Sequence, residues 1–104
     1  MAQTVAWTEV ATEDLNEVAE FIARDSVFYA SAVVREARAA ARSLRRFAER
    51  GRVVPEGGRP DIREIFVRDF RLIYHIVGRR VFVVAFIHGA RDLAALWQRR
   101  GSPV

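Results

Sequence analysis

The spacing of apolar residues predicts a helical hairpin in the first half of the chain. From Glu9 to Arg24, apolar side chains recur at three- and four-residue intervals, which places them on one face of an α-helix. They are Ala11, Leu15, Val18 and Ile22. A second helix is predicted over Val27–Arg50, and its inner stripe is Val33, Ala37, Ala40, Leu44 and Phe47. Only Asp25-Ser26 separates the two segments, so we expect an antiparallel hairpin.

From Ile62 onward the apolar pattern changes to the period of a β-strand. Three runs rich in β-branched and aromatic residues, IREIFV, FRLIYHIV and VFVVAFIH, are separated by Arg68-Asp69 and Gly78-Arg79. They predict an antiparallel meander. A two-residue turn at Gly78-Arg79 sets Ile76 opposite Val81, Tyr74 opposite Val83 and Leu72 opposite Ala85. The other face then carries Arg71, Ile73 and His75 beside Phe82, Val84, Phe86 and His88.

Three shorter segments complete the expected fold. Gln3–Trp7 suits a brief strand, the Gly- and Pro-rich Gly51–Pro60 suits a loop, and Asp92–Arg99 suits a short helix bearing Leu93, Leu96 and Trp97. We therefore predict one α+β domain over residues 1–104, in the order β-α-α-β-β-β with a short C-terminal helix. The largely antiparallel sheet packs on the hairpin, and the C-terminal segment or a partner covers its other apolar face.

Charge is unevenly distributed along this fold. The 104 residues include 17 basic and 13 acidic side chains, a net charge of +4, and every basic residue is Arg. The first predicted helix is acidic and the second is basic, so we expect opposite charges along their facing edges. A basic domain suits nucleic acid or an acidic protein partner.

Composition excludes several classes of site. The chain has no cysteine, so disulfides, cysteine-based zinc sites and thiol nucleophiles are excluded. Its two histidines, His75 and His88, do not have helical metal-ligand spacing, and we expect no metal and no cofactor. Residues 1–14 do not resemble a signal peptide, and no apolar run approaches the length of a membrane span. We expect a small cytoplasmic protein.

Arg71 stands out because it interrupts an apolar strand, where a charge is costly unless it is paired or lies at an open site. It is either an anchor for a phosphate or carboxylate, or one half of a structural ion pair with Glu64 or Asp69. His88 lies diagonally from Arg71 in the predicted register. It could act as an acid or base beside Arg91, and capping of the strand end is favoured. His75 is interpreted as a packing residue.

The ordered set of these segments resembles the RelE/ParE toxin superfamily over about residues 4–97. The resemblance rests on ATEDLNEVAEFIARDSVFYA, the Arg-rich helix, GRVVPE, IREIFV, FRLIYHI and VAFIHGARDL, above all on IREI, FRLIY and IHGARDL in that order. It implies the toxin of a type II toxin–antitoxin module, held inactive in a hetero-oligomer with a cognate antitoxin.

Two activities are known in the superfamily. RelE-like members cut mRNA on the ribosome, whereas ParE-like members inhibit DNA gyrase. Arg71 matches the sheet arginine of the RelE-like branch, but no tyrosine follows Tyr74, and the basic cluster is reduced to Arg63 and Arg68. A ribonuclease would have to use Arg71, His88 and Arg91. The IHGARDL ending favours the ParE-like branch.

The predicted partner surface differs from the ribonuclease residues. We assign antitoxin contacts to Arg35, Arg38 and Arg42 of the second helix and to Trp97, and phosphate or partner contacts to Arg63 and Arg68. A third interpretation is a nucleic-acid-binding module without catalysis. It is disfavoured because Phe66, Phe70, Phe82 and Phe86 lie within apolar strands and are expected in the core.

Overall fold

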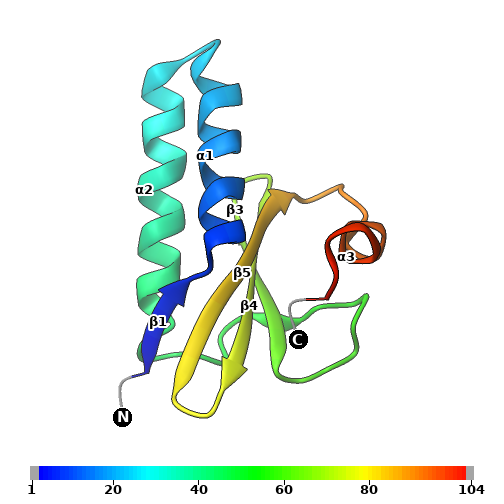
Figure 1. Cartoon of the computed structure of the whole chain (residues 1–104). Coiled ribbons are helices and arrows are strands. Elements are labelled where there is room, and N and C mark those ends of the chain that lie inside the picture. Colours follow the sequence, from blue (N-terminus) through cyan, green and yellow to red (C-terminus); the bar gives the residue numbers. More distant parts are fainter. Residues whose placement is uncertain (1–2, 103–104) are drawn as a thin grey trace.

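The computed structural model describes residues 3–102, in which a helical hairpin and a short C-terminal helix lie on opposite sides of a five-stranded sheet (Figure 1). The elements are β1 (Thr4–Trp7), α1 (Glu9–Ala23), α2 (Val27–Ser43), β2 (Arg52–Val53), β3 (Ile62–Val67), β4 (Phe70–Val77), β5 (Arg80–His88) and α3 (Leu93–Arg100). The sheet order is β1-β5-β4-β3-β2. Among the strands of residues 3–102, only β1, beside β5, is parallel to its neighbour. The predicted α+β fold is confirmed.

The hairpin helices begin at side-chain caps. The hydroxyl of Thr8 accepts a hydrogen bond from the backbone N–H of Ala11 at 3.1 Å, and that of Ser26 accepts one from Tyr29 at 3.0 Å. Each satisfies an N–H group that the first turn leaves without a partner. The predicted bounds of the first helix are confirmed to within one residue. No helix in residues 3–102 is long and apolar enough to cross a membrane.

The prediction that the second helix reaches Arg50 was wrong. α2 ends at Ser43, whose hydroxyl donates to the carbonyl of Ala40 at 2.6 Å and accepts from Arg50 Nη1 at 2.7 Å. Beyond this point the chain turns, so helical spacing no longer decides which residues are buried. Phe47, expected in the inner stripe, is 64% exposed, whereas Ala48 is buried.

The expected charge pairing between the two helices was also wrong. Within residues 3–102, no ion pair joins α1 to α2. The helices meet through apolar side chains, and Ala11, Leu15, Val33 and Ala37 are buried in one core with the sheet. Burial of apolar area, at about 25 cal/mol per Å², holds the hairpin on the sheet.

A β-bulge corrects the predicted register of the last two strands. Tyr74 pairs with Val83 as predicted, but Ile73 pairs with Ala85, which leaves Val84 as an extra residue in β5. Leu72 therefore lies opposite Phe86 rather than Ala85. Because side chains alternate along a strand, this one-residue insertion moves Phe86 into the core beneath the hairpin.

The other sheet face has a core of its own under α3. Its buried side chains are Val54, Ile62, Ile73, Val84, Ala85, Ile87, Leu93 and Leu96. Asp92 caps α3, since its carboxylate accepts from the N–H of Ala95 at 3.1 Å. The predicted C-terminal helix and its place on the sheet are confirmed. The predicted loop at residues 51–60 includes the two-residue edge strand β2.

Candidate functional site

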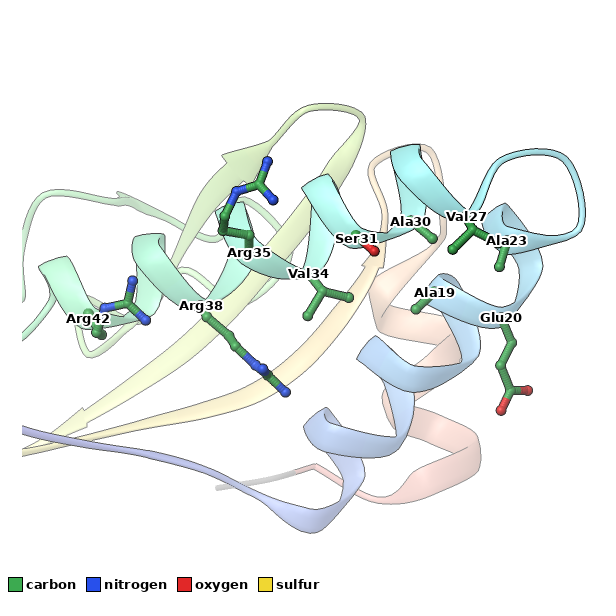
Figure 2. Close-up of a pocket in the computed structure, with 10 residues that line it drawn as sticks. All are labelled: Ala19, Glu20, Ala23, Val27, Ala30, Ser31, Val34, Arg35, Arg38 and Arg42. Carbon is green, nitrogen blue, oxygen red and sulfur yellow. The ribbon is translucent and has the colours of Figure 1, made fainter.

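A groove of about 610 Å³ lies between α1 and α2, on the side of the hairpin shown in Figure 2. Small and apolar side chains form its floor: Ala19, Ala23, Val27, Ala30 and Val34. Arg35, Arg38 and Arg42 lie along its α2 side, and Figure 2 shows Arg38 extending toward α1. Glu20 stands on the α1 rim. Three of the four predicted antitoxin contacts therefore share one groove.

The basic surface continues from this groove toward the edge of the sheet. Arg38 and Arg42 also line a second hollow, together with Arg45 and with Trp7 of β1. None of these arginines has a carboxylate within 4.0 Å in residues 3–102. Arg35 also interacts with Glu36 through space, but the described residues place no carboxylate in contact with these guanidinium groups, so the surface favours an acidic partner.

Arg71, by contrast, lies inside the protein and is held by two carboxylates. Its Nε donates to Glu64 at 2.6 Å, and its Nη1 and Nη2 donate to Glu56 at 2.9 and 2.8 Å. The side chain of Arg71 is 5% exposed and that of Glu64 is fully buried. Glu64 also accepts from Arg52 Nε at 2.5 Å. The structural alternative for Arg71, an ion pair with Glu64, is confirmed.

This network leaves Arg71 little capacity to bind a substrate phosphate. The two arginines and two glutamates cancel in charge, and both edges of the Arg71 guanidinium are occupied. Hydrogen bonds from Arg71 lower the pKa of Glu56. The pKa of Arg71 is raised, chiefly by its hydrogen bonds to Glu56 and then by its hydrogen bond to Glu64. Both groups are thus fixed in their charged forms at neutral pH.

Arg63 and Arg68 are engaged within the chain as well. The guanidinium of Arg63 donates to the carbonyls of Pro60 at 2.9 Å and Gly51 at 3.0 Å. Arg68 makes a bidentate pair with Glu36, at 2.9 and 2.6 Å. It follows that both arginines brace the sheet, Arg63 against the loop and Arg68 against α2.

The remaining ribonuclease candidates do not assemble around Arg71. His88 pairs with Phe70, one residue before Arg71, so the side chain of His88 lies on the sheet face opposite to that of Arg71. The predicted placement of His88 diagonally from Arg71 was therefore wrong. Its Nδ1 accepts from the N–H of Ala90 at 3.1 Å, which confirms the predicted capping role. One cleft is lined by the exposed residues His88 and Arg91. The contact of Arg71 with Arg91 is limited to the Arg91 carbonyl, which lies 3.5 Å from Arg71 Nη1.

Tyr74 and His75 have structural partners. The hydroxyl of the fully buried Tyr74 donates to the carbonyl of Ala48 at 2.7 Å and accepts from the N–H of Gly51 at 3.0 Å. Burial raises the pKa of this phenol. His75 lies 2.9 Å from Asp61, consistent with its interpretation as a packing residue.

Trp97 is separated from the other predicted antitoxin contacts by the sheet. It lies on α3 and packs beside the second core, whereas Arg35, Arg38 and Arg42 lie on the hairpin. The four residues therefore do not form one surface. Among the strand aromatics, Phe66 departs from its expected core position: it is 51% exposed, with the Arg52 guanidinium 5.3 Å from its ring centroid.

Comparison with known families identifies the family of this chain. Residues 5–93 match the family described as ParE toxin of type II toxin–antitoxin system, parDE. This chain belongs to the ParE toxin family. No curated protein sequence matches this ParE-family chain.

Two solved structures show what the ParE-family chain is similar to. A chain of the chromosomal ParDE toxin–antitoxin system from P. aeruginosa superimposes with a TM-score of 0.68 and 17% identity, over 84% of this chain and 96% of that one. A mutant of E. coli toxin RelE, in complex with an antitoxin RelBc peptide, gives 0.45 and 20%, over 100% and 99%. Only the first score is high enough to support a shared fold.

Sequence reasoning missed two acids that organise this ParE-family chain. Asp14 is buried, accepts from the N–H of Phe86 at 3.1 Å, and pairs with Arg100 at 2.6 Å. The carboxylate of Asp14 thus accepts a hydrogen bond from a backbone N–H of β5 beyond the end of β1, where no strand is left to pair with it. Glu56 was read as part of a simple loop, yet it closes one edge of Arg71. Within residues 3–102, no group of three His, Asp or Glu could hold a metal ion.

Proposed function

We propose that this chain is a toxin that inhibits DNA gyrase and is neutralised by an acidic antitoxin segment seated in the hairpin groove. The ParE family match supports the gyrase target, because ParE-like toxins act on gyrase. The groove supports the acidic segment, because an amphipathic helix could place apolar residues on the alanine and valine floor and carboxylates beside the arginines.

One observation carries the choice of the ParE-like over the RelE-like activity: the guanidinium of Arg71 is occupied by Glu56 and Glu64. Cleavage of mRNA needs cationic groups free to stabilise a phosphate in the transition state, together with an acid or base near the 2′-hydroxyl. Here the sheet arginine is neutralised, Tyr74 is buried, and His88 lies on the opposite face.

The test uses purified protein separated from its antitoxin, in two parallel assays. We expect loss of gyrase supercoiling at toxin concentrations that leave mRNA intact on programmed ribosomes. Cleavage of mRNA with normal supercoiling would overturn the proposal and reinstate the ribonuclease alternative.

A matched pair of variants tests the groove. Arg38→Glu places a negative charge in the middle of the groove, whereas Arg79→Glu changes an arginine of the Gly78-Arg79 turn, outside the groove lining. We expect Arg38→Glu to weaken binding of the acidic antitoxin at least 10-fold and Arg79→Glu to change it little. Equal losses would mean that overall charge, rather than the groove, determines binding.

A further inference from the structure

A second concave surface, which we call the arginine hollow, lies beside β1 at the edge of the sheet. It is a depression of about 470 Å³ between β1 and the C-terminal half of α2. Its lining residues are Thr4, Val5, Trp7, Arg38, Ala41, Arg42 and Arg45. The N–H of Gln3 donates to the carbonyl of Arg45 at 2.6 Å, which holds the turn after α2 against the start of β1. The fold itself therefore brings these arginines beside the edge strand.

The three arginines of the hollow follow one another along one side of α2. Arg38 and Arg42 come from successive turns of the helix, as Figure 2 shows, and the N–H of Arg45 donates to the Arg42 carbonyl at 3.1 Å, which continues the turn. At 1.5 Å per residue, the row from Arg38 to Arg45 is about 10 Å long. One strand of a DNA duplex presents about three phosphates over that length. The number and spacing of the guanidinium groups thus match a run of phosphates.

No acid offsets this charge from within the hollow, because none of its lining residues is Asp or Glu. Within residues 3–102, no carboxylate lies within 4.0 Å of Arg38, Arg42 or Arg45. Acids on the helices have other neighbours. Glu36 pairs with the sheet, and Glu13 and Glu17 act on the guanidinium of Arg100. Glu20 lines the groove and not the hollow. The hollow therefore presents a continuous positive charge to a partner.

Phosphates suit this hollow better than an apolar segment does. The apolar part of its lining belongs to the first core: Ala41 is buried there, and Val5 and Trp7 pack against it. Little apolar surface is left for a partner, in contrast to the alanine and valine floor of the groove. Arginine presents a planar fork that bonds two phosphate oxygens at once. Charged contacts of this kind, without an apolar floor, are how proteins bind the backbone of DNA.

We propose that the arginine hollow binds the phosphate backbone of double-stranded DNA through Arg38, Arg42 and Arg45. The inference rests on the proposed gyrase inhibition and deepens it: the toxin contacts the DNA that gyrase holds as well as gyrase itself. Arg38 and Arg42 also line the groove, so an antitoxin seated there competes with DNA for them. Because the contacts are to phosphates, binding does not depend on base sequence.

The experiment measures binding of a fluorescently labelled DNA duplex to antitoxin-free toxin, by fluorescence anisotropy at several salt concentrations. Arg45→Gln removes the one arginine of the hollow that does not line the groove. Arg99→Gln is the matched control, because it makes the same charge change at an exposed residue of α3, on the opposite side of the sheet (Figure 1). Arg45→Lys keeps the charge. Antitoxin affinity and melting temperature are measured for each variant.

We expect the DNA affinity of the wild type to fall about 40-fold when the salt concentration is raised about fourfold, because three phosphate contacts release counterions. For Arg45→Gln the fall is about 12-fold, because one contact is lost. Arg99→Gln and Arg45→Lys keep the wild-type salt dependence, and Arg45→Gln keeps the wild-type antitoxin affinity. The same salt dependence in Arg45→Gln and Arg99→Gln would overturn the proposal, since net charge alone would then explain binding. So would weaker antitoxin binding by Arg45→Gln with unchanged DNA binding, which would assign the hollow to the antitoxin.

Supercoiling assays on the wild type separate this inference from the proposed gyrase activity. If the wild type binds the duplex with the expected salt dependence and leaves supercoiling intact, gyrase is the wrong target, while the hollow stands as a DNA site. If the wild type inhibits supercoiling and its duplex affinity does not respond to salt, the gyrase proposal stands and the hollow does not bind DNA.

Discussion

The arginines of the sheet and those of the hairpin have opposite roles. Arg71 and Arg63 donate to carboxylates and carbonyls of their own chain. Arg35, Arg38 and Arg42 line a groove and have no carboxylate partner within residues 3–102. The same residue type is structural in one region and available in the other. The number of arginines therefore says less about partners than which guanidinium groups remain unoccupied.

Among the substitutions that test this contrast, Arg71→Ala has the largest expected effect, which is on stability. Arg71→Ala leaves the buried Glu64 with only the exposed Arg52 as a partner. Removing one member of a buried ion pair costs up to about 3–5 kcal/mol, and the 60% exposed Arg52 compensates the buried charge of Glu64 less well than Arg71 does. We expect a loss of this size in the free energy of unfolding, measured by urea denaturation, and almost none for Arg38→Ala. Equal stability of the two variants would show that Arg71 is not structural.

The comparison is sharpened by the salt dependence of antitoxin binding. The double substitution Arg35→Glu and Arg42→Glu reverses the charge of two groove arginines. It breaks no side-chain hydrogen bond or ion pair in the described chain. We expect at least a 10-fold loss of affinity, mainly through slower association, and a weaker dependence on salt than in the wild type. Stopped-flow association rates at several salt concentrations measure this. An unchanged salt dependence would exclude electrostatic recognition by the groove.

The smallest expected effect is a pH dependence of stability that arises from the ion pair of Arg71 with Glu56 in the sheet region. The pKa of Glu56 is lowered from the ordinary 4.5, chiefly by hydrogen bonds from Arg71. The contribution of ionised Glu56 to the free energy of unfolding is therefore complete above pH 4.5. It is lost as the pH falls through the lowered pKa that Glu56 has in the folded state. Glu56→Gln should be less stable than the wild type at pH 7, and the difference should narrow in acid.

Thermal unfolding between pH 7 and pH 3 measures this narrowing. Glu20→Gln is a suitable control, because Glu20 is exposed, lies beyond the first turn of α1 and has no ion-pair partner in the described chain. A constant difference between Glu56→Gln and the wild type across the range would contradict the assignment of Glu56 to the Arg71 network.

The sequence pattern predicted the parts of the fold that depend on local periodicity. Both hairpin helices, the three meander strands and α3 follow from apolar spacing and turn residues. The bulge at Val84 could not be read in this way, because Val83, Val84 and Ala85 are all apolar and suit either register. The end of α2 at Ser43 depends on side-chain contacts with Arg50, which apolar spacing does not encode.

Prediction of the site was limited by interactions between distant residues. The three hairpin arginines could be grouped from the sequence because they lie on one helix. The ion pair of Arg71 with Glu64 was among the alternatives, but its second partner could not be predicted, because Glu56 reaches it from a Gly-rich loop 15 residues earlier in the chain. His88 was misplaced because the bulge exchanges the sheet faces at the end of β5.

The most direct test of the contrast between the two regions is NMR of the arginine Nε–H groups, with and without antitoxin. We predict slow solvent exchange for Arg71, whose Nε donates to the buried Glu64, and fast exchange for Arg35, Arg38 and Arg42. Antitoxin should slow exchange and shift the signals of these three, and leave Arg71 unchanged. Fast exchange at Arg71, or a response to antitoxin at Arg71 and not in the groove, would contradict the account.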